Sequence, residues 1–361
     1  MMSDRICFPY EDEEYNLPEF VKDMGEIYDR MSDDLSKEIL TSRILLCLTE
    51  DYCYMANVIM HTQGGKKLNQ VIKDRKGKPQ FIYGAGIRGK RMLRLFPNNN
   101  WGGFIDRNNN QDNGCNMKIW SVEEFRKLYT PGTAIFVSNM METEQIVRNL
   151  ENQGIRSDDI YVLNVFDKEG AADMYFQSEC IGESVGKEKA FVDIGCYDGQ
   201  DTLHYMKWNN DYETKIYAFE PNMKNYEICE ENLKNFPNVK LLNIGLSDKA
   251  GKISMEGNGE TSHIGNNGTE EICTQLLDNI IQEDLVGYMK IDVEGYEENV
   301  LRGAEKTIRN QKPTLAVSLY HKRLDVWRIP MLLLKYNQNY HFYLRYYGAA
   351  NGDTVLYAID K

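Results

Sequence analysis

Short apolar runs alternate with amphipathic segments through the second half of the chain. Regular alternation of this kind predicts a parallel β-sheet with helices between its strands. The end of the chain differs, because two apolar runs, 341–347 and 354–359, flank the polar segment 348–353. These runs predict an antiparallel hairpin that closes the sheet. The parallel strands are expected at 190–194, 215–219, 239–244, 287–291 and 314–320, with helices over 222–235 and 297–310.

A shorter pattern of the same kind precedes the larger sheet. Four apolar runs and a helix over 142–152 predict a small Rossmann-like sheet, with strands at 80–83, 103–106, 134–137 and 160–163. Residues 17–61 show helical periodicity, which Gly64-Gly65 and Lys66-Lys67 are expected to end. The fold class is therefore α/β. We expect a helical cap or dimer element over 1–75, the small Rossmann-like domain over 76–168 and the larger domain over 169–361.

Composition narrows the choice of partners. The 361 residues carry a formal charge of −13, which argues against nucleic acid, because phosphate binding needs a basic surface. No apolar run is long enough to span a membrane, and the acidic segment 11–14 near the start is unlike a signal peptide. The eight cysteines are scattered, which predicts reduced thiols in a cytoplasmic protein.

The segment 190–202 carries the most informative pattern. An apolar run ends at Asp193, passes through Gly195 and Gly199, and opens an amphipathic segment, so it predicts a strand, a tight turn and a helix start. The spacing Asp-x-Gly-x-x-x-Gly suits S-adenosylmethionine (SAM) and differs from the dinucleotide pattern Gly-x-Gly-x-x-Gly. Glycines at such a turn let a ligand approach the backbone closely.

Polar groups follow each predicted strand of the larger sheet, where ligands of parallel sheets bind. Glu220 can accept hydrogen bonds from both ribose hydroxyls, and Thr202 with the amides of the helix start can take the carboxylate of SAM. Asp193 can orient the turn or hold the cationic end of SAM through water. Ser247 and Asp248 can contact the adenine edge or serve as turn residues.

Methyl transfer to an alcohol also needs a group that removes a proton. The candidates are His321, Asp292 and Glu294, and His263 in the polar loop 259–265 is a weaker one. Asp292 and Glu294 can alternatively hold Mg²⁺ or cap the helix that follows them. The expectation is a site without a metal. The polar loop itself is a candidate lid over the acceptor.

The second half resembles the FkbM family of SAM-dependent methyltransferases. The resemblance rests on the turn motif, Phe219-Glu220-Pro221, Leu246-Ser247-Asp248 and above all Lys290-Ile291-Asp292-Val293-Glu294-Gly295. It implies O-methylation of a glycan, sugar or natural-product hydroxyl by a methyltransferase domain at 169–361. It also implies SAM contacts at Asp193, Gly195, Gly199, Glu220 and Ser247 or Asp248, with Asp292 and Glu294 near the methyl group. His321 matches a histidine that follows the fifth strand.

The first half leaves other functions open. Gly84-x-Gly86-x-x-Gly89 with Asp106 fits the dinucleotide fingerprint, so a nucleotide or nucleotide-sugar can bind there, or the domain can serve docking or homodimerisation. One alternative function is an NAD-dependent sugar-nucleotide oxidoreductase, and another is a non-catalytic SAM- or nucleotide-binding scaffold of a glycan assembly cluster. The run 106–114 resembles a calcium loop but lacks its sixth-position glycine, which predicts a solvated loop.

Overall fold

The computed structural model describes most of the chain and divides it into two compact units. The described residues are 5–7, 14–107, 116–168, 173–182, 185, 188–256, 263–264, 270–281, 283–348 and 353–361. The larger unit comprises Met1–Leu40, Asp173–Arg345 and Thr354–Lys361, and the smaller unit comprises Thr41–Ala172 and Tyr346–Asp353. The three segments expected from the sequence, 1–75, 76–168 and 169–361, stay a prediction.

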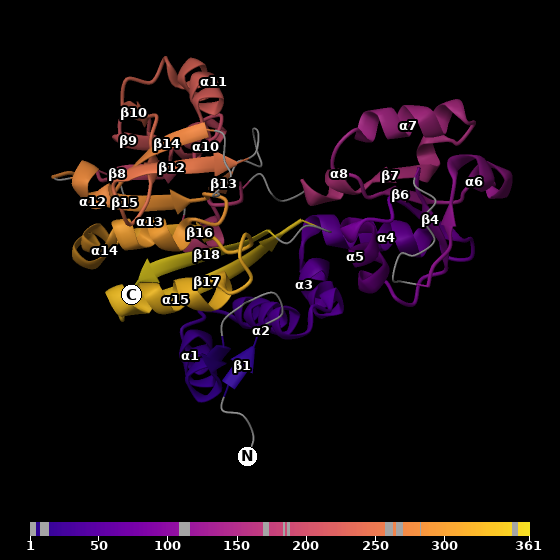
Figure 1. Cartoon of the computed structure of the whole chain (residues 1–361), viewed down its shortest axis with the longest axis horizontal. Coiled ribbons are helices and arrows are strands. Elements are labelled where there is room, and N and C mark those ends of the chain that lie inside the picture. The colour runs from indigo at the N-terminus through magenta and orange to yellow at the C-terminus, as the bar shows by residue number, and fades with distance from the viewer. Residues whose placement is uncertain are drawn as a thin grey trace. The chain divides into compact units, whose positions relative to one another are not determined.

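A seven-stranded sheet forms the centre of the larger unit. Its strand order is β10-β9-β8-β15-β16-β18-β17. The first five strands in this order pair in parallel, and β18 pairs antiparallel with β16 (Figure 1). This arrangement confirms the predicted parallel sheet closed by an antiparallel strand. The strands are β8 (Ala190–Ile194), β9 (Ile216–Phe219), β10 (Val239–Leu242), β15 (Val286–Ile291), β16 (Thr314–Ser318), β17 (Tyr340–Tyr347) and β18 (Asp353–Asp360).

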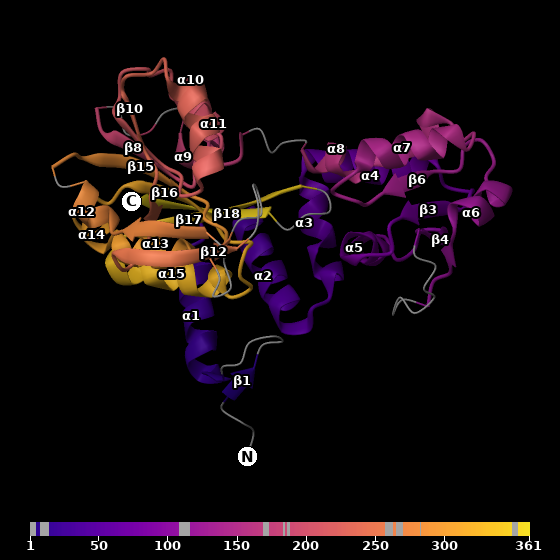
Figure 2. The ribbon, with the colours of Figure 1, turned by 45° about the horizontal axis from the view of Figure 1, so that its top comes forward.

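Every residue of β8, β9 and β15 is buried, which explains why these strands are continuous apolar runs in the sequence. Helices α10 and α11 lie on one side of the sheet, and α13, α14 and α15 lie on the other (Figures 1 and 2). The helices of this unit are α1 (Leu17–Asp29), α9 (Ser178–Ile181), α10 (Gln200–Asn209), α11 (Met223–Leu233), α12 (Leu277–Ile280), α13 (Glu297–Gly303), α14 (Glu305–Gln311) and α15 (Asp325–Tyr336). The single helix expected over 297–310 is thus two helices, with Ala304 between them.

A second sheet of four strands was not expected from the sequence. It has the order β11-β14-β12-β13, in which β12 pairs antiparallel with β14. Ile272 and Thr274 are buried while Glu271, Cys273 and Gln275 are exposed, so β14 has the alternation of a half-buried strand. The strands are β11 (Gly245–Leu246), β12 (Gly251–Glu256), β13 (His263–Ile264) and β14 (Glu270–Gln275). Two further strands, β1 (Arg5–Cys7) and β2 (Glu14–Asn16), form an antiparallel pair.

The smaller unit contains a parallel sheet of five strands, one more than expected. Its order is β5-β4-β3-β6-β7, so β3 lies at the centre. The strands are β3 (Gln80–Tyr83), β4 (Trp101–Ile105), β5 (Ile119–Trp120), β6 (Ile135–Val137) and β7 (Ile160–Val162). Its helical elements are η1 (Tyr52–Met55), α3 (Ala56–His61), α4 (Gln63–Asp74), α5 (Ile87–Leu95), α6 (Val122–Leu128), α7 (Thr143–Asn152), η2 (Ser157–Asp159) and α8 (Leu163–Asp167). Helix α2 (Asp34–Thr49) contributes residues to each of the two units.

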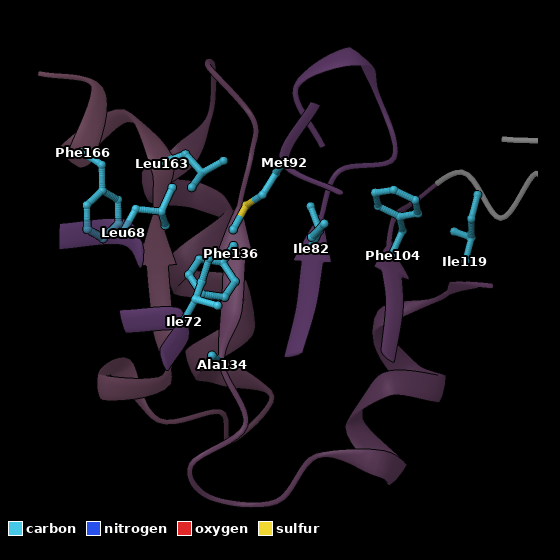
Figure 3. Close-up of a cluster of buried hydrophobic side chains, with 10 residues drawn as sticks. All are labelled: Leu68, Ile72, Ile82, Met92, Phe104, Ile119, Ala134, Phe136, Leu163 and Phe166. Atoms are coloured by element: carbon cyan, nitrogen blue, oxygen red, sulfur yellow. The ribbon is translucent and has the colours of Figure 1, made fainter. Parts of the chain in front are cut away.

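One face of this sheet packs against helices through a cluster of apolar side chains (Figure 3). Ile82 and Phe104 point from strands β3 and β4, and Met92 reaches the cluster from α5. Leu68 and Ile72 come from α4, which fixes that helix to the sheet. Burial of such side chains is the main source of stability for a unit of this kind.

The pair Gly64-Gly65 does not break the helical pattern as expected, because it lies in the first turn of α4. A Cβ at Gly64 would overlap the carbonyl oxygen of Phe166, and one at Gly65 would overlap that of Ile59. Both glycines therefore allow close packing of backbone segments. The hydroxyl of Thr62 caps this helix by accepting a hydrogen bond from the Gly65 amide at 2.9 Å.

Two predictions fall on residues that the structure does not describe. The run 108–114 and most of the polar loop 259–265 lie outside the described residues, as does the side chain of His263. Among the described residues, no helix has the length and apolar character that crossing a bilayer requires.

Candidate active site

Four strands of the larger sheet end side by side, as the sequence predicted. The Gly195 amide donates to the carbonyl of Phe219 at 3.0 Å, and the Asp292 amide donates to the carbonyl of Ile194 at 3.0 Å. These bonds join the ends of β8, β9 and β15. His321 follows β16, the next strand along the same edge. The polar residues that follow these strands therefore share one edge of the sheet.

The turn after β8 is shaped by Gly195, which has φ +78°. A Cβ at this position would overlap the carbonyl oxygen of Asp292 on the neighbouring strand. Glycine is thus required here by the approach of β15 as well as by the backbone conformation. Gly199, with φ +81°, is the N-cap of α10. Close approach of a ligand to these glycines stays a prediction.

Lys290 on β15 fixes the turn after β8 by binding its backbone, a role that was not expected from the sequence. Its side chain is 1% exposed, and its ammonium donates to the carbonyl oxygen of Gly195 at 2.6 Å. The same ammonium lies 3.3 Å from Asp193 Oδ1 and 3.2 Å from Asp201 Oδ2. Burial alone would lower the pKa of Lys290, but these carboxylates and that of Asp292 raise it above its ordinary value, so the side chain is charged.

Asp193 and Thr202 are both fully buried. The Thr202 hydroxyl donates to Asp193 Oδ2 at 2.6 Å, and the other oxygen of Asp193 faces Lys290. Asp193 therefore has the contacts of a group that orients the turn, the first of the two roles considered for it. The Thr202 hydroxyl serves Asp193 in this structure, which leaves the backbone of the helix start as the candidate partner of a carboxylate.

Glu220, which follows β9, is 6% exposed. One carboxylate oxygen accepts the Tyr197 amide at 3.0 Å and the other accepts the Asn222 amide at 2.9 Å. Burial raises the pKa of Glu220, and these two amide bonds oppose the rise. A carboxylate has about four acceptor positions. Glu220 is thus tied to the glycine turn and keeps acceptor capacity for a ligand.

Ser247 and Asp248 follow β11 and are fixed to α13. The Ser247 hydroxyl donates to Asp248 Oδ1 at 3.1 Å, and the Asn299 side chain donates to the same oxygen at 3.2 Å. A Cβ at Gly303 would overlap the carbonyl oxygen of Ser247. The pair therefore has a defined position beside the sheet edge, and its contact with adenine stays a prediction.

Asp292 accepts hydrogen bonds from two tyrosines. The Tyr175 hydroxyl donates to Oδ2 at 2.9 Å, and the Tyr320 hydroxyl donates to Oδ1 at 3.1 Å. Burial would raise the pKa of Asp292, but Lys290, His321 and the hydrogen bonds lower it overall. Asp292 is therefore an ionised carboxylate at neutral pH.

Tyr175 was not expected at the site, because no motif or strand pattern surrounds it in the sequence. Its φ is +90°, a conformation that non-glycine residues adopt only at a cost of about 1–3 kcal/mol. The Tyr357 hydroxyl accepts from its amide at 3.2 Å, and the Tyr288 hydroxyl donates to its carbonyl. Its own hydroxyl also lies 3.1 Å from Ser318 Oγ. These bonds hold a strained residue where it reaches Asp292.

His321 lies among three carboxylates. Its Nδ1 is 2.7 Å from Glu297 Oε1, and its Nε2 is 3.4 Å from Glu294 Oε2 and 3.7 Å from Asp292 Oδ1. Burial would lower the pKa of His321, but Glu294 and Glu297 raise it to about 10. An imidazole with that pKa is protonated at pH 7 and has no lone pair for another proton. The structure thus brings together the three predicted catalytic residues and adds Glu297, while the base among them stays a prediction.

Comparison with known proteins gives the architecture a context. The model of the methyltransferase FkbM domain matches residues 193–348. The FkbM methyltransferase from Methylobacillus flagellatus is similar in structure, with a TM-score of 0.52 and 15% identity, over 90% of this chain and 99% of that protein. This likeness concerns the fold. No curated protein matches the chain in sequence.

Two further solved structures match about half of the chain. Fibrillarin from Aeropyrum pernix, with bound S-adenosyl-L-methionine, has a TM-score of 0.32 and 10% identity over 48% of this chain and 66% of its own. An O-methyltransferase from Bacillus cereus, in complex with S-adenosylhomocysteine (SAH), has a TM-score of 0.32 and 12% identity over 48% and 74%. The family match, and not these weaker likenesses, shows that residues 193–348 are similar to the methyltransferase FkbM domain.

Proposed function

We propose that the chain is a SAM-dependent O-methyltransferase that modifies a hydroxyl of a glycan, sugar or natural product. The observation that carries the proposal is the buried carboxylate of Glu220, which is bonded to the glycine turn after the first strand of a methyltransferase domain. An acid in this place is suited to both hydroxyls of a ribose.

The residues around the turn fit the parts of SAM. The remaining acceptor positions of Glu220 suit the ribose hydroxyls, and Ser247 with Asp248 offers polar groups for the adenine. The backbone amides at the start of α10 suit the carboxylate, because a helix N-terminus favours an anion. Lys290 and Asp193 support the turn and are too deeply buried to contact a ligand.

When bound, SAM supplies a methyl group on a positively charged sulfur. The chain's part is to orient the acceptor hydroxyl and to receive its proton as the new carbon–oxygen bond forms and the carbon–sulfur bond breaks. Asp292 and Glu294 are the proposed proton acceptors, and His321, which is protonated at pH 7, is proposed to orient the acceptor. Asp292 is held in place by the hydroxyls of Tyr175 and Tyr320.

The charge of the site limits the acceptor. Asp292, Glu294 and Glu297 surround a single imidazole, so an anionic acceptor group would be repelled there. A neutral hydroxyl, such as one on a sugar ring, suits this environment. The alternative ligands of the smaller unit, NAD or a nucleotide-sugar at the Gly84 turn, rest on the sequence pattern alone.

Calorimetry on the full chain with SAM, SAH and NAD tests the proposal. We expect SAM and SAH to bind, and methyl transfer from labelled SAM to appear with a panel of glycans and polyols. Binding of NAD but not SAM would favour the sugar-nucleotide oxidoreductase. Binding of SAM without transfer to any acceptor would favour a non-catalytic scaffold.

A further inference from the structure

The cluster around His321 has polar atoms that the protein itself does not satisfy. Glu297 is 1% exposed, and its Oε1 accepts the amides of Val293 at 3.0 Å and Gly295 at 3.3 Å. Its other oxygen, Oε2, is buried and has no hydrogen-bond partner. The same is true of Nε2 on His321, whose side chain is 9% exposed. Buried polar atoms of this kind are costly unless something binds them.

The contact between His321 and Glu297 fixes which nitrogen is available. Nδ1 lies 2.7 Å from a carboxylate oxygen, so it carries the hydrogen and donates it. A cation that displaces the Nε2 proton of the imidazolium would meet a lone pair that faces two carboxylates, those of Glu294 and Asp292. Either that proton or a metal cation has to lie between these groups. A carboxylate that holds the far nitrogen of a histidine is also the usual support of a metal-binding histidine.

The distances favour an ion over a hydrogen bond. Nε2 is 3.4 Å from Glu294 Oε2 and 3.7 Å from Asp292 Oδ1, whereas an N–H···O hydrogen bond spans about 2.7–3.2 Å. Ligand atoms that are each about 2.1 Å from one ion lie about 3.0–3.4 Å apart, close to the first of these separations. One ligand atom each from Asp292, Glu297 and His321 lie within 4.8 Å of one another.

The lysines beside the cluster have other contacts. The Lys290 ammonium lies against Asp193, Asp201 and the carbonyl of Gly195, and that of Lys322 lies 5.7 Å from the centre of the Tyr296 ring. Neither is placed between the carboxylates and the imidazole. The charge of the cluster is therefore open to a bound cation.

We propose that Nε2 of His321 and a carboxylate oxygen of Asp292 bind a divalent cation, with Glu297 as the carboxylate that holds the other ring nitrogen of His321. Glu294 lies at its exposed rim and can add a further oxygen. One nitrogen with several carboxylate oxygens suits Mn²⁺, Fe²⁺ or Zn²⁺ better than it suits Ca²⁺. The site differs from the Mg²⁺ alternative considered for Asp292 and Glu294, because the buried and unsatisfied Nε2 of His321 is a ligand and Glu297 orients the imidazole.

The cation would also define the acceptor, a consequence that rests on the proposed function. A hydroxyl bound to a divalent cation loses its proton more readily than a free one. The proton passes to Glu294, whose side chain is 41% exposed and can release it to water. The oxygen then bonds to the methyl carbon while sulfur keeps the electron pair of the broken bond. An acceptor with two neighbouring oxygens, such as a vicinal diol, would chelate the cation best.

Electron paramagnetic resonance with Mn²⁺ tests the site in the full chain after removal of metals by a chelator. We expect one Mn²⁺ to bind per chain, which lowers the signal of free Mn²⁺. Electron spin echo modulation should show a directly bound ¹⁴N, which a nonspecific carboxylate site cannot produce. His321→Ala should weaken binding by about tenfold or more, and Glu297→Gln by about 10–100-fold.

Glu298→Gln is the matched control, because Glu298 is the next residue on α13 and pairs with Arg302 at the surface. It should bind Mn²⁺ as the unsubstituted chain does. The absence of binding, or binding without ¹⁴N modulation, would overturn the site and leave a proton between the carboxylates. The nitrogen signature needs no variant, so the test stands even if His321→Ala fails to fold. Calorimetry with SAM on the metal-free chain separates the cation site from the proposed methyltransferase function. SAM should still bind if only the cation site is wrong.

Discussion

The two parallel sheets of this chain use the same device at the end of their second strand. In the larger unit Glu220 accepts the backbone amide of Tyr197 in the turn after the first strand, at 3.0 Å. In the smaller unit Asp106 accepts the amide of Ala85 in the corresponding turn, at 2.8 Å. In both sheets an acid thus holds a glycine-containing turn, so this feature alone does not distinguish a catalytic site from a structural one.

The sheets differ in what surrounds the turn. In the smaller unit the Ser138 hydroxyl donates to the carbonyl of Tyr83 at 2.9 Å, and Arg88 forms an ion pair with Asp167. Buried polar atoms without a hydrogen-bond partner occur in both units, for example on Tyr83 and Arg88 in the smaller unit and on Glu297 and His321 in the larger one. The charges differ, because Arg88 and Asp167 balance one another, whereas three carboxylates lie close to the single imidazole of His321. The difference teaches that an excess of like charge at a strand end, more than a glycine pattern or an unsatisfied atom, indicates where chemistry takes place.

The largest effect is expected from replacing Lys290, whose buried ammonium binds the turn after β8 in the larger unit. Lys290→Met leaves the buried carboxylate of Asp193 unpaired, which should cost about 3–5 kcal/mol of unfolding free energy and weaken SAM binding. Hydrogen exchange measured by mass spectrometry would locate the loss in the larger unit. Arg88→Met is the counterpart in the smaller unit, where it should destabilise its surroundings and leave SAM affinity unchanged. Equal SAM affinity in both variants would contradict the support assigned to Lys290.

The acids at the two turns provide the next comparison. Glu220→Gln should weaken SAM binding about 10–100-fold, because hydrogen bonds to a charged group contribute about 1.5–3 kcal/mol. Asp106→Asn is the matched control and should not change SAM affinity. Calorimetry measures both. If the two substitutions had the same effect, Glu220 would not be the ribose partner.

The pH dependence of binding sharpens this assignment. Burial raises the pKa of Glu220, so its carboxylate gains a proton at a less acidic pH than an exposed glutamate does. The protonated form loses acceptor capacity, so SAM affinity should fall as the pH is lowered through this raised pKa. Glu220→Gln cannot titrate and should lack that fall in affinity.

A pair of glycines tests the geometry of the turns. Gly195→Ala forces a Cβ against the Asp292 carbonyl at a positive φ, which should cost about 1–3 kcal/mol of stability. At Gly86 in the smaller unit, φ is −76° and a Cβ would meet no atom within 4 Å, so Gly86→Ala should be nearly neutral. Thermal unfolding compares the two. A neutral Gly195→Ala would show that the turn can relax away from β15.

The smallest effect is expected from a single hydroxyl. Tyr175→Phe removes a hydrogen bond to Asp292, worth about 1 kcal/mol, and should slow methyl transfer by about tenfold at most with little change in SAM affinity. Tyr83→Phe is the control in the smaller unit, where the buried Tyr83 hydroxyl has no hydrogen-bond partner. That variant should transfer methyl groups at the normal rate. A Tyr175→Phe enzyme of normal rate would mean that Tyr320 alone orients Asp292.

The elements predicted best from the sequence are those decided by burial alone. Strand β3 has the predicted bounds, as does β8, because each is a buried apolar run next to a glycine turn. The strands β12 and β14 were missed, because polar and charged residues outnumber the apolar ones in each of these short segments. Helix α4 was missed because the glycines at its start serve close packing with Phe166 and Ile59, which no local pattern reveals.

The candidate site was predicted in part for the same reason. Glu220, Asp292 and His321 follow apolar strands, so the strand pattern alone located them at one edge. Tyr175 has no such context, because tertiary hydrogen bonds impose its conformation and its position. Glu297 was hidden by its place at a helix start, where an acid ordinarily needs no explanation beyond the helix dipole.

The bond from Lys290 to the carbonyl of Gly195 joins residues that are 95 positions apart in the sequence. Grafting the turn segment 190–202 onto another parallel sheet would therefore leave it without the cation that fixes it. A working transplant must include β15, with its lysine, beside β8. The unit that can be moved is a pair of strands adjacent in space, and a substitution in one strand constrains the choice of residues in the other.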